Sequence, residues 1–160
     1  MISKSTEPQT VESTYLYALR LLTGRDYTVV GMLRKFSARG VSESDAETVI
    51  ARLQREGWLD DRRYAERFAE SAMSNGRFFG PRLKQEMLRR GFDAGLVSDV
   101  LTGLTGDFDE GNEVRQVLER RYSGFCFSTA TDRDKRKIIG YLQRRGFGLS
   151  AIMNALKAAK

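Results

Sequence analysis

Residues 83–104 read LKQEMLRRGFDAGLVSDVLTGL, and two partial copies of this stretch lie elsewhere in the chain. The copies are MLRKFSARGVSESDAETVIARL at residues 32–53 and IIGYLQRRGFGLSAIMNALKAA at residues 138–159. Each copy has an Arg-Gly pair followed by an apolar residue, in the segments Arg39-Gly40-Val41, Arg90-Gly91-Phe92 and Arg145-Gly146-Phe147. Self-similarity of this kind is typical of an array of small repeated units.

Each repeated glycine is predicted to end one helix. Glycine adopts the left-handed conformation that closes a helix, and the apolar residue after it packs back on that helix. A second helix should follow each glycine at once. Helix starts are also indicated where Ser42 with Asp45 and Thr131 with Asp134 have the spacing of a capping box. The pair Gly80-Pro81 predicts a further helix start, with proline at the first helical position.

A third amphipathic segment precedes each helix pair, at residues 14–23, 60–74 and 110–123. The sequence has only two prolines, and its apolar residues recur at helical spacing. We therefore expect an all-α fold of three tandem three-helix repeats, stacked into an elongated, curved array. The expected divisions are a disordered segment at residues 1–13, then repeats at residues 14–59, 60–106 and 107–160.

The composition restricts the possible functions. The 160 residues include no His and one Cys, which excludes Ser-His or Cys-His catalytic pairs and disulfide frameworks. Cys126 lies in FCF and is interpreted as an apolar, inert thiol. The sequence has no P-loop glycine motif, membrane-length apolar run or secretory signal. These observations predict a cytoplasmic protein without cofactor, metal or enzymatic activity.

The stretch GWLDDRRYA at residues 57–65 is predicted to join the first two repeats. Gly57 should end a helix, and Asp60 or Asp61 should cap the next one. Trp58 and Leu59 should fill the seam between the repeats. A metal-binding or general-acid pair of carboxylates is the alternative, but the absence of His and the adjacent arginines favour the cap.

A basic face is the main candidate binding surface. Residues 109–160 hold eleven Lys and Arg against six Asp and Glu, within a chain of net charge +6. The candidates in the second repeat are Arg77, Arg82, Lys84, Arg89 and Arg90, and those in the third are Arg133, Lys135, Arg136, Lys137, Arg144 and Arg145. Phosphates or acidic side chains would suit this face, and a merely solvated face is the alternative. Phe78 and Phe79 are interpreted as anchors of a helix start, with base stacking as the alternative.

The chain resembles the RecX family of regulators of the bacterial recombinase RecA. The resemblance rests on YALRLLTGRDYTVVGMLRKFSARGVSESDAETVIARLQREGWLDDRRYAERFAESAM, then GPRLKQEMLRRGF and RRGFGLSAIMNAL. It extends from about Tyr15 to Leu156. The residues that match the family signature are Gly57, Trp58, Asp60, Asp61, Tyr64, Gly80, Pro81 and Gly91.

The resemblance implies a non-enzymatic protein that binds the RecA–DNA filament. Such binding would block filament extension and lower recombinase, ATPase and co-protease activity in DNA repair and the SOS response. It also implies structural roles for the signature residues. We further expect a monomer with no membrane partner, and we leave open whether single-stranded DNA is a second partner beside the filament. Two features depart from the family pattern. Gly31 lies inside a predicted helix, and Gly80-Pro81 is one residue closer to Leu83 than is usual.

A helix-turn-helix transcriptional regulator remains the alternative, because short helix-Gly-helix units on a basic protein look similar. That class predicts base-specific binding to duplex DNA by one recognition helix. Three equivalent helix pairs without a distinctive recognition surface argue against it. A helical nuclease using Asp60 and Asp61 is a more distant alternative.

Overall fold

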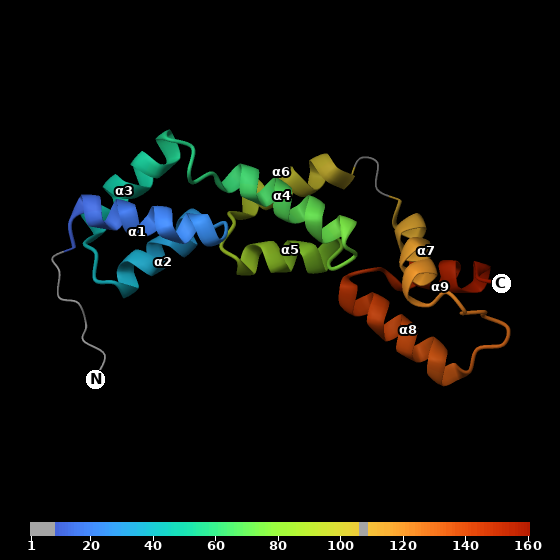
Figure 1. Cartoon of the computed structure of the whole chain (residues 1–160). Helices are drawn as coiled ribbons and strands as arrows, with labels where there is room; N and C mark the ends of the chain where they lie inside the picture. Colours follow the sequence, from blue (N-terminus) through green and yellow to red (C-terminus); the bar gives the residue numbers. More distant parts are fainter. Residues whose placement is uncertain (1–8, 106–108) are drawn as a thin grey trace, which may run out of the picture. The chain divides into compact units, whose positions relative to one another are not determined.

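The computed structural model describes residues 9–105 and 109–160, which are drawn in colour in Figure 1. These residues form nine α-helices and no strand, which confirms the all-α prediction for this part of the chain. The helices are α1 (Val11–Gly24), α2 (Val29–Ala38), α3 (Glu43–Arg55), α4 (Asp61–Ser74), α5 (Gly80–Arg89), α6 (Ala94–Thr105), α7 (Glu110–Arg121), α8 (Asp132–Arg145) and α9 (Leu149–Ala158).

The described residues fall into two compact units. The first holds the residues up to Ala65 together with Arg90–Phe92, and the second holds Glu66–Arg89 and Asp93–Lys160. The boundary expected between residues 106 and 107 lies outside the described residues. None of the described helices is both long enough and apolar enough to cross a bilayer.

The chain becomes helical earlier than the sequence indicated. Helix α1 begins at Val11, so the expectation of a disordered segment is wrong for residues 11–13. Thr10 caps this helix, because its side-chain oxygen accepts a 3.0 Å hydrogen bond from the Ser13 amide. The Ser13 hydroxyl accepts in return from the Thr10 amide at 2.9 Å. Residues 1–8 of the expected segment lie outside the described residues.

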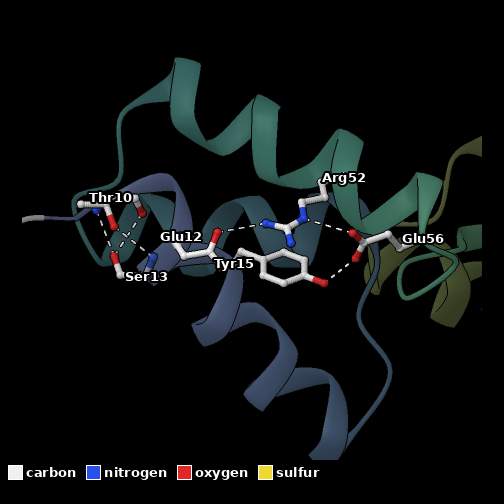
Figure 2. A network of polar contacts seen from close by, with 6 residues as sticks. All are labelled: Thr10, Glu12, Ser13, Tyr15, Arg52 and Glu56. Carbon is white, nitrogen blue, oxygen red and sulfur yellow. Dashed lines mark hydrogen bonds and ion pairs between the residues drawn. The ribbon is translucent and has the colours of Figure 1, made fainter.

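Helices α1 and α3 pack together in the first unit and share a polar network (Figure 2). Arg52 of α3 bonds Glu12 of α1 and Glu56, at 3.1 Å in each case. Its guanidinium carbon also lies 3.6 Å from the centroid of the Tyr15 ring, and the Tyr15 hydroxyl donates to Glu56. Beneath this network lies an apolar core that includes the fully buried Phe36 and Leu53.

The repeated glycines end helices as predicted. Gly40, Gly91 and Gly146 have φ values of 80°, 96° and 104°, in the left-handed region that favours glycine. The amide of Val41 donates to the Phe36 carbonyl at 3.0 Å, and the amide of Phe147 donates to the Leu142 carbonyl at 3.2 Å. Val41, Phe92 and Phe147 are buried, so the apolar residue after each glycine does pack inward.

Two of these glycines also contact the start of an earlier helix in the same compact unit. In the first unit, the hydroxyl of Thr28 before α2 donates to the Arg90 carbonyl at 3.1 Å. In the second unit, the amide of Phe79 before α5 donates to the Arg145 carbonyl at 2.7 Å. In both cases the acceptor belongs to the arginine that precedes the repeated glycine. The second and third repeats therefore contact the start of the preceding repeat's middle helix in the same way, through the arginine before the repeated glycine.

Gly31, which the sequence marked as a departure, has a local explanation. It lies in the first turn of α2, and its amide donates to the capping hydroxyl of Thr28 at 2.9 Å. A Cβ at this position would lie 3.1 Å from that hydroxyl oxygen, which is tighter than most Cβ contacts. Helix α5 begins at Gly80, whose φ of 48° is not helical, and Pro81 follows it.

Candidate functional site

In the GWLDD stretch, Trp58 is exposed, although the sequence predicted that it fills a seam between repeats. Trp58 is 55% exposed and Leu59 is 2% exposed, so only Leu59 is buried. Gly57 has φ 80°, and the amides of both following residues donate to the Leu53 carbonyl, at 2.9 and 3.2 Å. This turn directs Leu59 into the core of the first unit. The prediction that Trp58 fills a seam is therefore wrong.

The two carboxylates of this stretch serve two different helices. Asp60 accepts a 3.0 Å hydrogen bond from the Arg63 amide and so caps α4. Asp61 accepts a 2.9 Å bond from the amide of Val29, the first residue of α2. Burial raises the pKa of Asp61, the bond from Val29 opposes that rise, and the charge of Asp60 adds to it. The bond to Asp60 supports the predicted cap of the next helix, whereas Asp61 bonds the start of α2 instead.

Tyr64 and Gly91, two further signature residues, have structural roles in packing. The Tyr64 ring packs at 4.8 Å from the Phe92 ring, between centroids. A Cβ at Gly91 would lie 3.0 Å from the Thr28 hydroxyl oxygen and 3.3 Å from the Val30 Cβ. Gly91 is thus fixed by its backbone conformation and by close packing. No group of three or more His, Cys, Asp or Glu in the described ranges could hold a metal ion.

The basic residues of the second repeat are all exposed. They are Arg77, Arg82, Lys84, Arg89 and Arg90. Arg89 bonds the carboxylate of Glu86 at 2.7 Å, and the Glu86 side chain is only 4% exposed. This ion pair offsets the Arg89 charge, so Arg89 is partly engaged by a local contact.

The basic residues of the third repeat lie along α8. Arg133, Arg136, Lys137 and Arg144 are exposed, while Lys135 and Arg145 are half-buried. The Lys135 amine lies 4.1 Å from the centroid of the Phe127 ring, and Arg145 donates to the Arg77 carbonyl at 3.1 Å. Two of the six predicted residues are thus partly engaged by local contacts.

Some of the basic residues of the second and third repeats lie around two aromatic rings, Phe78 and Tyr141, in the second unit. The guanidiniums of Arg77 and Arg82 each lie 5.6 Å from the Phe78 centroid. Arg145, which bonds the Arg77 carbonyl, lies 5.0 Å from the Tyr141 centroid. We call the set Arg77, Phe78, Arg82, Arg121, Tyr141 and Arg145 the aromatic–arginine cluster.

The anchoring role expected of both phenylalanines belongs to Phe79 alone. Phe79 is 1% exposed, and its ring stacks on Phe147 with centroids 4.1 Å apart. Phe78 is half-buried and lies between arginines. Aromatic rings beside guanidiniums can bind unstacked bases or aromatic partner side chains.

Arg121 and Tyr141 were not among the residues predicted from the sequence. The Arg121 guanidinium lies 4.3 Å from the Tyr141 centroid, and a hydrogen bond with Tyr122 raises the pKa of Arg121. Tyr122 packs edge-on against Tyr141, with centroids 6.0 Å apart. The available signal was the Arg120-Arg121 pair at the end of a predicted helix, together with a tyrosine inside the third repeat copy.

The thiol of Cys126 differs from the inert group expected. It is half-buried, and its Sγ lies 3.1 Å from the Ser128 hydroxyl. Hydrogen bonds from Ser128, and then from Thr129, lower the pKa of Cys126 to about 7. The lowered pKa makes this thiol easier to ionise than an ordinary cysteine.

Comparisons with known proteins agree in one family. A family model described as "RecX, first three-helix domain" matches residues 15–53, and one described as "RecX, second three-helix domain" matches residues 60–101. "Regulatory protein RecX" of Trichlorobacter lovleyi is 46% identical over 133 residues, covering 83% of this chain and 86% of that protein. Its namesake in Thermus thermophilus is 34% identical over 145 residues, covering 90% of each.

The fold is also similar to solved structures. A crystal structure of RecX from Lactobacillus salivarius superposes with a TM-score of 0.73 at 21% identity, covering 92% of this chain and 94% of that chain. A second structure, described as regulatory protein RecX, gives a TM-score of 0.69 at 18% identity, covering 91% and 72%. At these identities the structures support the helical fold.

Proposed function

Because this chain belongs to the RecX family of regulatory proteins, we propose that it is a non-enzymatic modulator of the bacterial recombinase RecA. It binds the RecA–DNA filament, blocks filament extension, and lowers recombinase, ATPase and co-protease activity. The observation that carries the proposal beyond the family name is the aromatic–arginine cluster, which gathers four guanidiniums around Phe78 and Tyr141.

The charge of this cluster suits the proposed partner. A nucleoprotein filament presents DNA phosphates and acidic protein side chains, and arginine forks bind both phosphate and carboxylate oxygens in pairs. Phe78 and Tyr141 hold the neighbouring guanidiniums through cation–π contacts, which lowers the conformational entropy lost on binding. We assign the filament contact to this cluster, with Lys84, Arg136 and Arg144 as further contributors.

Inhibition then follows from preferential binding. A protein that binds one filament state more tightly than another shifts the population toward that state by its difference in affinity. Binding that favours a state unable to extend or to turn over nucleotide would oppose growth and ATP hydrolysis together. No step in this scheme requires a catalytic residue of this chain.

A pull-down tests the proposal directly. RecA assembled on single-stranded DNA with a non-hydrolysable ATP analogue is immobilised through the DNA, and retention of this chain is compared with retention on the same DNA alone. The proposal predicts strong retention that depends on RecA. Equal retention with and without RecA contradicts it, and preferential retention on a duplex of defined sequence favours a transcriptional regulator instead.

A further inference from the structure

A surface hollow in the second unit shares Arg121 and Tyr141 with the aromatic–arginine cluster and adds Arg120 and Asn75, to which the proposed function gives no role. Its volume is about 290 Å³, and it lies between the turn after α4, the end of α7 and helix α8. The lining residues are Asn75, Gly76, Val117, Arg120, Arg121 and Tyr141. The lining therefore contributes two guanidiniums, an amide and a phenol, and no carboxylate.

Local contacts hold the guanidiniums in place before any ligand arrives. Arg121 lies 4.3 Å from the Tyr141 centroid, and Arg145 lies 5.0 Å from the same centroid. The Nε of Arg120 donates to the Gln116 carbonyl at 3.4 Å. A Cβ added at Gly76 would lie 3.8 Å from the Arg120 Nη2, so this guanidinium lies close beside the glycine.

The charges in the hollow are not balanced from within. In the part of the chain that the structure describes, Arg120 and Arg121 of the lining form no ion pair with a carboxylate, and neither does Arg145, which lies beside the Tyr141 ring. Arg121 and Arg145 face one ring, so their separation is on the order of the Debye length of about 10 Å at 0.1 M ionic strength. Their mutual repulsion costs free energy, which a bound anion would offset.

The helix dipole accounts for only part of this arrangement. The last turn of a helix favours cations, which explains Arg120 and Arg121 at the end of α7. Arg145 reaches the same ring because it lies four residues after Tyr141 on α8. Neither the dipole nor this spacing explains why Asn75 lines the hollow. Asn75 uses one amide hydrogen for Ser71, at 3.2 Å, and has a second to donate.

We propose that this hollow binds one phosphate group, with Arg120 and Arg121 as its charged donors and Asn75 as a neutral one. The planar fork of arginine matches the spacing of phosphate oxygens. The volume is large enough for a phosphodiester with its attached sugar as well as for a free phosphate. The inference rests on the proposed function in one respect, because DNA in the filament is the expected source of the phosphate.

The test uses the full chain and two double variants of equal charge change. Arg120→Gln with Arg121→Gln alters the hollow. Arg115→Gln with Lys157→Gln removes the same charge from exposed positions of α7 and α9 that do not line it. The first measurement is the affinity for a fluorescent oligothymidylate as a function of salt. The second is NMR of the arginine Nε–Hε signals during titration with inorganic phosphate.

We expect the hollow variant to bind the oligonucleotide at least about tenfold more weakly. Its log-log salt slope should fall in magnitude by about 0.7, the value for one phosphate on a single strand. The control variant should lose less affinity and keep the wild-type slope. Phosphate should shift the Arg120 and Arg121 signals of the wild-type chain.

The remaining outcomes separate the phosphate sources. Shifts with inorganic phosphate and an unchanged oligonucleotide slope would support the site with free phosphate as its ligand. Equal slopes for both variants together with unshifted Arg120 and Arg121 signals would overturn the inference. RecA is absent from both measurements, so a wild-type chain that binds phosphate here but is not retained on the filament contradicts the proposed function alone.

Discussion

A Cβ added to Gly146 would lie 2.0 Å from the carbonyl oxygen of Phe79. The glycine therefore ends α8 and also allows this helix end to meet the start of α5, where the Phe79 amide bonds the Arg145 carbonyl. The corresponding relationship in the first unit is looser, since a Cβ at Gly91 would lie 3.0 Å from the Thr28 hydroxyl oxygen. One short motif thus combines a helix end with a contact between repeats.

Gly146→Ala should lower the free energy of unfolding by more than about 2 kcal/mol, because it adds a steric overlap to an unfavourable backbone conformation. Gly40→Ala, with φ 80° and open space around the Cβ position, should cost about 1 to 2 kcal/mol. Gly103→Ala, in an exposed part of α6 with no atom within 4 Å, should be neutral or stabilising. Urea denaturation followed by circular dichroism measures all three, and equal losses at Gly146 and Gly40 would contradict the packing argument.

Leu59→Ala should lower the free energy of unfolding by about 2 to 5 kcal/mol, because it leaves a cavity in the core of the first unit. Trp58→Ala should change it by less than about 1 kcal/mol, since most surface substitutions have small effects. Circular dichroism is the suitable probe, because Trp58 is the only tryptophan of the sequence. A larger loss for Trp58→Ala than for Leu59→Ala would show that the turn at Gly57 directs the tryptophan inward.

Asp61→Asn should keep or raise the melting temperature at pH 7. Burial raises the folded-state pKa of Asp61, so its charged form destabilises the fold above that pKa, while asparagine still offers an oxygen to the Val29 amide. Asp61→Ala removes the acceptor and should cost about 1 kcal/mol. Differential scanning calorimetry across pH should show the advantage of Asn shrinking as the pH falls through the raised pKa. A clear loss for Asn at neutral pH would show that the carboxylate charge is itself stabilising.

The network around Glu56 should make the first unit sensitive to acid. The hydrogen bond from Tyr15, and then that from Arg52, lower the pKa of Glu56 below its ordinary 4.5. Its contribution to stability is therefore present above pH 4.5 and lost as the pH falls through the lowered pKa. Glu56→Gln should be less stable than wild type at pH 7, with the difference vanishing at low pH. Glu47→Gln, on an exposed position of α3, the helix that ends just before Glu56, is the control, and its stability difference from wild type should not vary with pH in this way.

The fold was largely readable from the sequence because its signals are local. A glycine that ends a helix and a serine or threonine that begins one act within a few residues. Both signals can be identified from residue type and spacing alone. The side-chain positions at the joints were less accessible. Trp58 and Leu59 are neighbours of similar hydrophobicity, and only the backbone turn at Gly57 decides which one is buried.

Only part of the candidate site could be predicted, because charge is visible in the sequence but side-chain contacts are not. Arg77, Arg82 and Arg145 were identified from charge alone. Each lies within four residues of the ring that it contacts, but the two groups are joined by the hydrogen bond from Arg145 to the Arg77 carbonyl, between residues far apart in the sequence. Charge also misled at Arg89, whose partner Glu86 is buried three residues earlier on the same helix. Net charge along a sequence does not distinguish a paired arginine from one that can bind a partner.

The ATPase activity of RecA on single-stranded DNA, measured with increasing amounts of this chain, tests the central claim most directly. The wild-type chain should inhibit, and Arg77→Glu with Arg82→Glu should require at least about tenfold more protein for the same inhibition. Arg115→Glu with Lys157→Glu carries the same charge change outside the aromatic–arginine cluster and should inhibit like wild type. Circular dichroism confirms that each variant is folded. Full inhibition by a folded Arg77→Glu, Arg82→Glu variant would contradict the assignment of the filament contact to this cluster.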